Sequence, residues 1–268
     1  MLRFHSSVLA MLLVAVSAAG QSFDPVVCYG GRSEFMRFVK QELVYPPKAM
    51  EERKQGTVYV YCIVNANGST RDARIFKGVS PEVDAEAMRL FNKVLWEPAI
   101  QDGQNHDSEA ILEIPFDISR YKRWCKKRGY TELQYPYGPP KSTNHVYSRH
   151  ELDSLPQPLL PDTSMTLKQH IAKNIRYPQA AVRQSIEGVA RVSFVVEPNG
   201  TVSNVYAANY LGGGCTEEVM TVLRNVRWYP GVQNGETVRT LLNVSFTFRL
   251  PEEQPARSAA TVPHSMGQ

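Results

Sequence analysis

The pattern of apolar and polar residues changes period along this chain, alternating first and then becoming helical. From Gly56 onward every second residue is apolar, which is the period of a strand with one buried face. These alternating positions are Val58, Val60, Cys62 and Val64. The pair Asn67-Gly68 then predicts a tight turn with positive φ angles, leading into a second strand over 69–76.

The next segment has apolar residues at 83, 87, 90, 91 and 94, which is the stripe of an amphipathic helix. Trp96 follows, and Pro98 prevents the helix from continuing. A Gly-containing loop leads to a last strand over 110–116, and a short helix is expected beside Tyr45-Pro46. The unit therefore reads helix, strand, strand, helix, strand.

The same pattern occurs a second time 132 residues later, where Tyr177 stands in the place of Tyr45. Its landmarks in the first copy are Tyr45, Pro46, Gly56, Asn67, Gly68, Trp96 and Pro98, and in the second Tyr177, Pro178, Gly188, Asn199, Gly200, Trp228 and Pro230. Without any gap, 16 of the 73 positions from 45 to 117 are identical in 177–249, far more than chance gives. Two copies this far apart predict two domains rather than a solenoid.

We therefore predict an α+β protein: two copies of a small three-stranded antiparallel sheet with two helices packed on one face. The first copy is expected over 28–118 and the second over 164–250. The linker over 119–163 opens with a basic cluster at 120–128 and then becomes rich in Pro and Tyr, so we expect it to be extended and partly stiff. The tail over 251–268 has no periodicity and is predicted to be disordered.

The first twenty residues differ from the rest. Arg3 and His5 precede an apolar run over 8–19 that ends in small residues, which is typical of a secretory signal peptide over 1–20, cut after Gly20. The run is shorter than the roughly 20 residues that a membrane-spanning helix needs. We expect an exported protein with no stable membrane span; an uncleaved signal that holds the chain in the membrane is the alternative.

Four cysteines in an exported chain raise the question of disulfides. Cys62 falls on a strand position that Phe194 holds in the second copy, and Cys215 falls on a helix position that Val83 holds in the first. Both are therefore interpreted as buried hydrophobes. Cys28 and Cys125 lie just outside the two ends of the first copy and are the pair to test for a disulfide; four free thiols are the alternative.

Nothing that recurs in both copies has catalytic character. Glu86 and Glu218 are the one shared acid, at a helix position that predicts a solvated face. Cys125 with His145 lacks further partners, so no metal site and no cofactor are predicted. The net charge of +4 does not argue for nucleic acid, and the basic cluster is interpreted as a solvated linker, with nucleic acid or anionic headgroups as alternatives.

The ordered set of Tyr-Pro-x-x-Ala, Gly-x-Val-x-Val, Asn-Gly, Trp-x-Pro and a final strand ending in Phe116 or Phe248 resembles the C-terminal domain of TonB. The resemblance covers both copies. It implies that a short peptide of an outer-membrane receptor adds to a sheet edge, with backbone hydrogen bonds supplying affinity. The implied edge is the last strand of each copy, at Ile111, Leu112, Ile114, Phe116, Asn243, Val244, Phe246 and Phe248. The alternative is that these strands only complete the sheet.

The leading hypothesis is a non-catalytic periplasmic protein that binds an envelope peptide or protein partner and is linked to outer-membrane transport. We expect this protein to differ from TonB in having no long membrane anchor and no long Pro-rich spacer before the domain. The alternative is a membrane-anchored energy transducer for outer-membrane receptors, held by an uncleaved signal. A hydrolase or metal enzyme that uses Cys125 and His145 is a distant third reading.

Overall fold

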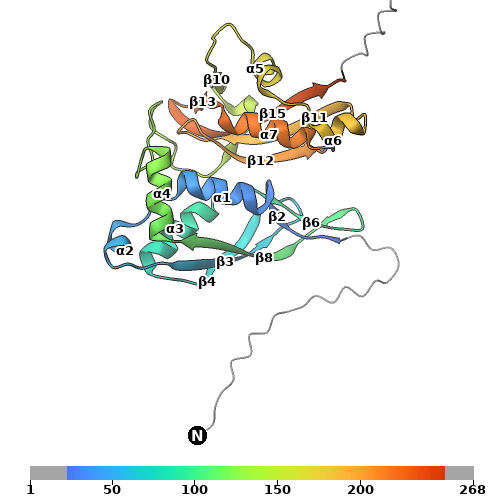
Figure 1. Ribbon diagram of the computed structural model, residues 1–268. Coiled ribbons are helices and arrows are strands. Elements are labelled where there is room, and N and C mark those ends of the chain that lie inside the picture. Colours follow the sequence, from blue (N-terminus) through green and yellow to red (C-terminus); the bar gives the residue numbers. More distant parts are fainter. Residues whose placement is uncertain (1–22, 251–268) are drawn as a thin grey trace, which may run out of the picture.

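The structure is a computed structural model that describes residues 23–250. The expected signal peptide and the tail from residue 251 lie outside the described residues. Within them, two α+β domains lie one above the other (Figure 1).

The first domain builds its sheet from three strands in the order β4-β3-β8, all antiparallel. Its main elements are α1 (Gly31–Glu42), α2 (Pro47–Glu51), β3 (Gly56–Val64), β4 (Thr70–Lys77), α3 (Pro81–Phe91) and β8 (Ser108–Phe116). Short strands complete it: β1 (Phe23–Asp24), β2 (Val27–Cys28), β5 (Trp96–Glu97), β6 (Ala99–Gln101) and β7 (Gln104–His106). The segment before α1 pairs through β2 with β5.

The second domain repeats this plan with the strand order β12-β11-β15-β14. Its elements are α5 (Leu167–Asn174), α6 (Gln179–Arg183), β11 (Gly188–Val196), β12 (Val202–Asn209), α7 (Cys215–Asn225), β13 (Arg227–Tyr229), β14 (Gly231–Gln233) and β15 (Glu236–Phe248). The predicted fold class is confirmed, and helices lie on both sides of each Tyr-Pro pair rather than on one side only.

Each domain has one apolar core between its sheet and its helices. The alternating residues of β3 and the helical stripe of α3 all enter the first core, and Cys62 and Cys215 are fully buried as expected. In each copy the Tyr of the Tyr-Pro pair packs edge-on against the final Phe. The ring centroids lie 5.7 Å apart for Tyr45 and Phe116 and 5.3 Å apart for Tyr177 and Phe248.

The Asn-Gly turns differ in detail from the prediction. Gly68 and Gly200 have positive φ angles of 80° and 76°, whereas the Asn before each does not. The Gly N–H closes the turn on the carbonyl three residues earlier, at 2.8 Å in both copies. The Asn67 side chain accepts instead from the backbone N–H of Ser69 at 3.0 Å. Asn is therefore selected for its side-chain hydrogen bond, and only Gly for its φ angle.

Glu86 is buried, which corrects the expectation that it lies on a solvated face. Its carboxylate accepts a hydrogen bond from the backbone N–H of Val44 at 2.8 Å, and Glu218 accepts one from Arg176 at 3.4 Å. The shared acid therefore fixes the backbone just before each Tyr-Pro pair to the long helix of its domain.

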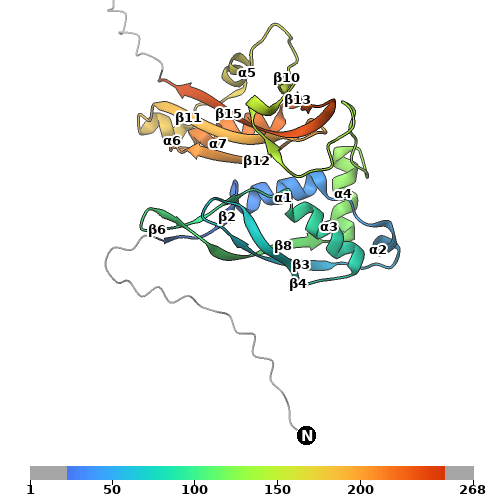
Figure 2. The same cartoon turned by 180° about the vertical axis from the view of Figure 1, so that it is seen from behind.

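The linker is more ordered than its composition predicts. Its basic start forms the helix α4 (Ile118–Arg128), which stands beside the C-terminal end of α1 (Figure 2). The Asp117 side chain caps its first turn, and Gly129, at φ 83°, ends it. Arg128 donates to the carbonyls of Lys40 and Leu43 at 3.0 and 2.8 Å. These contacts with the first domain fix a segment that composition alone presents as solvated.

The second half of the linker adds strands to the second domain. Strand β9 (Val146–Tyr147) runs parallel to the start of β15, and β10 (Gln157–Leu159) runs antiparallel to β13. A short 3₁₀ turn, Arg149–Glu151, separates them. The linker is therefore part of the second domain's sheets rather than a spacer.

All four cysteines are free thiols, so the bridge between Cys28 and Cys125 is not formed in this structure. Cys28 lies at the N-terminal end of α1, in a small cavity that Phe35 also lines. Cys125 lies in α4, which holds the C-terminal end of that helix. A 12-residue helix is about 18 Å long, which is well beyond disulfide reach.

The two domains are stacked so that helices of the first domain lie between the two sheets (Figure 1). Helix α1 lies between the two sheets and contacts β12 of the second domain. The Arg37 guanidinium donates to the Val202 carbonyl at 2.8 Å, and the ring of Tyr29 is stacked on that of Tyr206 at 3.8 Å. The first domain thus covers the outward face of the second domain's sheet.

Candidate functional site

The outer edge of β8 is open. Among residues 23–250, β3 is the strand that pairs with β8, and it does so without a register shift from Ser108 to Phe116. Pro115 has no N–H, and proline is tolerated in a sheet where its nitrogen faces away from the neighbouring strand. The backbone N–H and C=O groups that point to the open edge of β8, away from β3, are therefore those of the odd-numbered residues Glu109, Ile111 and Glu113.

A groove of about 400 Å³ follows this edge. One wall is β8 itself, and the other is formed by the segment that pairs with β5 and by the first turns of α1. The lining residues are Pro25, Val26, Val27, Cys28, Arg32, Phe35, Trp96, Glu109, Ala110, Ile111, Leu112 and Glu113. Two of the few large apolar side chains that are exposed, Val27 (39%) and Ile111 (52%), lie in it.

The structure separates the residues predicted for this edge into two kinds. Leu112, Ile114 and Phe116 are buried core side chains, so they could serve a partner only through the strand that they anchor. Ile111 points to the outward face, opposite Tyr61. The neighbours that share this face, Glu109 and Glu113, were missed, although the period of two from Ile111 would have identified them.

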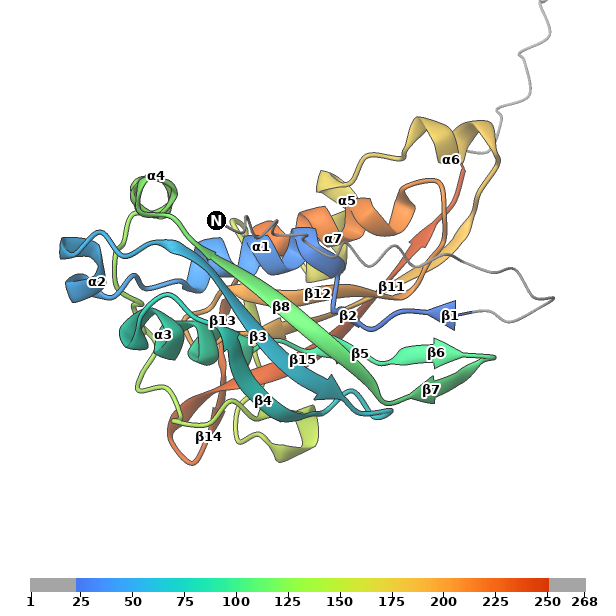
Figure 3. The ribbon, with the colours of Figure 1, turned by 90° about the horizontal axis from the view of Figure 1, so that it is seen from below.

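The outward face of the first sheet, built from β4, β3 and β8, is turned towards the viewer in Figure 3. The side chains on this face are arranged by strand. On β4, the Arg74 guanidinium lies 4.0 Å from the Tyr61 ring centroid, and Lys77 lies 5.7 Å from that of Tyr59. On β8 the same face presents Glu109 and Glu113. Burial and the Glu109 carboxylate raise the pKa of Tyr61, and Arg74 opposes that shift. Cations, tyrosines and carboxylates therefore follow one another across the three strands.

The edge of β15 in the second domain is partly occupied by the chain's own linker. The Thr237 N–H donates to the Pro139 carbonyl and its carbonyl accepts from Lys141, both at 2.9 Å. Farther along, Val146 and Tyr147 pair with Arg239 and Thr240.

The predicted edge residues of the second copy lie beyond this point. Phe246 and Phe248 are buried, Val244 is half-buried and Asn243 is exposed. Apart from β11, no strand within the described part of the chain pairs with 243–248.

Buried charges hold the two domains together. Lys93 bridges Glu42 at 2.7 Å and Glu197 at 3.6 Å, and Glu197 also pairs with Arg239 at 3.0 Å. Burial opposes ionisation of Glu197, but Arg239 and Lys93 outweigh it and lower the pKa of that carboxyl to about 2. Asn199 of the second Asn-Gly turn donates to Glu42 at 3.0 Å. The repeated turn thus has a docking role in the second copy.

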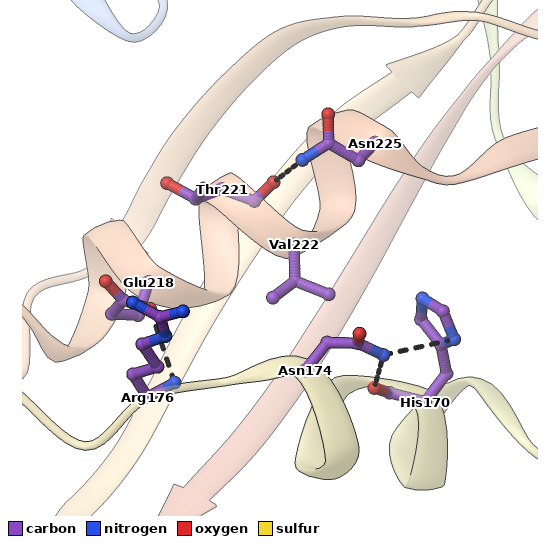
Figure 4. A pocket seen from close by; sticks show the side chains of 7 residues that line it. All are labelled: His170, Asn174, Arg176, Glu218, Thr221, Val222 and Asn225. Carbon is purple, nitrogen blue, oxygen red and sulfur yellow. Dashed lines mark hydrogen bonds between the residues drawn. The ribbon is translucent and has the colours of Figure 1, made fainter.

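A polar pocket of about 350 Å³ lies between α5 and α7 (Figure 4). Its lining residues are His170, Asn174, Arg176, Glu218, Thr221, Val222 and Asn225. The first copy has Glu42, Arg89 and Lys93 where the second has Asn174, Thr221 and Asn225. Glu42 and Lys93 contact the second domain, whereas their counterparts Asn174 and Asn225 line this pocket.

The remaining candidates do not form a site. His145 packs against Tyr147 and contacts Glu151 in the linker, whereas Cys125 lies in α4. Over residues 23–250, no group of three or more His, Cys, Asp or Glu side chains is placed to hold a metal ion. In the same range, no helix has both the length and the apolar character that a membrane crossing requires.

Comparison with known families matches the one described as Gram-negative bacterial TonB protein C-terminal to residues 41–118 and again to 173–250. The chain belongs to this family. It is a TonB-like protein with tandem copies of the domain, of a family associated with the Gram-negative envelope and its transport.

Among solved structures, the solution NMR structure of the Pseudomonas aeruginosa TonB C-terminal domain matches at 22% identity and a TM-score of 0.29. The match covers 41% of this chain and 99% of that one. A search of the curated proteins finds no significant match.

Proposed function

We propose that this TonB-like protein is a non-catalytic periplasmic binding protein that takes up an extended segment of an envelope partner by strand addition at β8. An outer-membrane receptor of the TonB-dependent kind is the partner that this proposal favours. The signal-like pattern of residues 1–20 supports export, and the domain family supports an envelope partner.

One observation carries the proposal: the nine-residue outer edge of β8 is unpaired within the described chain and borders a groove with exposed apolar side chains. An open strand edge is a ready template for another strand, and proteins usually block such edges when they have no use for them. Here the outward N–H and C=O groups of Glu109, Ile111 and Glu113 are available to a partner. The side chains of Val27 and Ile111 are available to contact it.

The test removes a single outward N–H. Ile111→Pro takes away one donor without touching the ladder to β3, and Asn243→Pro makes the matched change in the second copy. A phage library of random short peptides would be selected on the full chain and on both variants. We expect peptides that bind the unmodified chain and Asn243→Pro but are lost on Ile111→Pro.

Circular dichroism and thermal melting would first establish that both variants are folded. Peptides that bind Ile111→Pro as well as the unmodified protein, or a selection that enriches none, would overturn the proposal.

A further inference from the structure

We infer that the strand added to β8 carries a basic, an apolar and a second basic side chain at alternate positions, in the pattern basic-x-apolar-x-basic. This inference rests on the proposed function and names the chemistry of the partner at that site. The pattern reads the same in both directions, so it holds for parallel and antiparallel addition.

The register of β8 sets the spacing. Glu109, Ile111 and Glu113 lie on one face of the strand, because their β3 partners Ile63, Tyr61 and Tyr59 alternate with core positions. Side chains directly across neighbouring strands contact each other, and opposite charges there are favourable. A strand laid along β8 therefore meets two carboxylates on this face, with an apolar side chain midway between them.

Glu109 interacts with the Tyr61 hydroxyl, but within residues 23–250 no cation forms an ion pair with it. The cations that β4 places on the outward face are engaged elsewhere. Arg74 and Lys77 lie over tyrosine rings, and Arg71 pairs with Asp107 at 2.7 Å. Within residues 23–250 Glu113 pairs with Arg32 at 3.3 Å, and the side chains are 46% and 68% exposed respectively. Exposed ion pairs contribute little, so an incoming cation can replace Arg32 at small cost.

The same charges argue against a second copy of this chain as the occupant. In a symmetric antiparallel pair of β8 strands centred on Ile111, Glu109 of each strand would lie across Glu113 of the other. Like charges directly opposite are destabilising. Acidic side chains on this edge therefore disfavour pairing between two β8 strands and favour a cationic partner. Charged side chains on edge strands commonly prevent edge-to-edge association of identical chains.

The second copy provides an internal control. Positions 109, 111 and 113 correspond to Leu241, Asn243 and Ser245 in β15, where no residue is charged. A partner that is recognised by charge should therefore distinguish the two edges even if both accept strands.

The experiment compares two capped peptides, one with the core Lys-Thr-Val-Thr-Lys and one with Glu-Thr-Val-Thr-Glu, by calorimetry on the full chain. We expect the basic peptide to bind on the order of tenfold more tightly, because two exposed pairs change from attraction to repulsion. The double variant Glu109→Lys/Glu113→Lys should reverse the preference. Ser245→Lys, which matches the Glu113 change in the second copy, should leave the preference unchanged.

Equal affinity for both peptides, or a preference that the double variant leaves intact, would overturn the charge pattern. A different result would overturn the proposed function, namely that Ile111→Pro binds both the basic and the acidic peptide as tightly as the unmodified chain does. A preference that weakens at high salt supports the inference, because exposed pairs are screened. A preference that persists there contradicts it.

Discussion

The two domains share a sheet and a register but differ in what covers the sheet. Ser193 and Val195 of the second domain lie on the face away from its own core, and yet both are buried. The first domain lies on this side, where Tyr29 stacks on Tyr206, the β12 partner of Ser193. Their equivalents in the first domain, Tyr61 and Ile63, are half-exposed. Because the first domain packs on the second, the outward face of the first domain's own sheet and the long edge of β8 remain uncovered.

A polar trio at the end of each sheet shows how this difference is built into the sequence. The second copy has Glu197, Ser203 and Arg239, joined by hydrogen bonds and buried under the first domain. The first copy has Asn65, Arg71 and Asp107 at the same positions. Here Arg71 donates to both of the others, and Arg71 and Asp107 are about half-exposed. Both copies join these three positions by side-chain hydrogen bonds, centred on Glu197 in the second and on Arg71 in the first, and only the second trio is buried.

The largest expected effect comes from removing one member of the buried trio. Arg239→Ala leaves Glu197 buried with one cation fewer, and removing one partner of a buried pair costs about 3–5 kcal/mol. Asp107→Ala changes the same position of the exposed trio and should leave the free energy of unfolding almost unaltered. Urea denaturation followed by tryptophan fluorescence measures both, and equal losses would contradict the difference between the domains.

Acid should weaken the interdomain contact in a defined window. The pKa of Glu197 is lowered from 4.5 to about 2, so the stability that its ionisation contributes is complete above pH 4.5. That contribution is lost as the pH falls from 4.5 towards 2, by at most roughly 3 kcal/mol. The free energy of unfolding of Glu197→Gln should be lower at neutral pH and depend less on pH in this window. Parallel profiles for the two proteins would refute the assignment.

The shared acid offers a smaller comparison. Glu86→Ala removes the acceptor of the Val44 N–H in the first domain, which should cost about 1–3 kcal/mol. Glu218→Ala removes a longer and more exposed bond in the second domain and should cost less. Thermal unfolding ranks the two variants, and a larger loss for Glu218→Ala would show that the copies do not use this acid as described.

The smallest expected effect concerns the linker strand. Tyr147 is buried beside β15, and Tyr147→Ala should loosen β9 and speed hydrogen exchange at 237–240 with little change at 243–248. Unaltered exchange at 237–240 would mean that the linker does not protect this edge.

Much of the fold could be predicted, because the two copies report the same periodic pattern independently. The core positions of Cys62 and Cys215 follow from period and register alone. The burial of Glu86 could not be predicted, since the helix pattern does not show which neighbour covers that face. Nor could helix α4, because its order comes from contacts of Arg128 with α1 that composition does not report. For the site, the sequence and the family resemblance indicated the strand but not its outward residues Glu109 and Glu113.

Residue-resolved hydrogen exchange, with and without a peptide selected on the full chain, tests strand addition at β8 most directly. Added backbone hydrogen bonds should slow exchange at Glu109, Ile111 and Glu113, because their N–H groups face the open edge. The matching residues of β15 should exchange at unchanged rates. Protection at 241–245 instead, or bound peptide without protection on β8, would contradict the account.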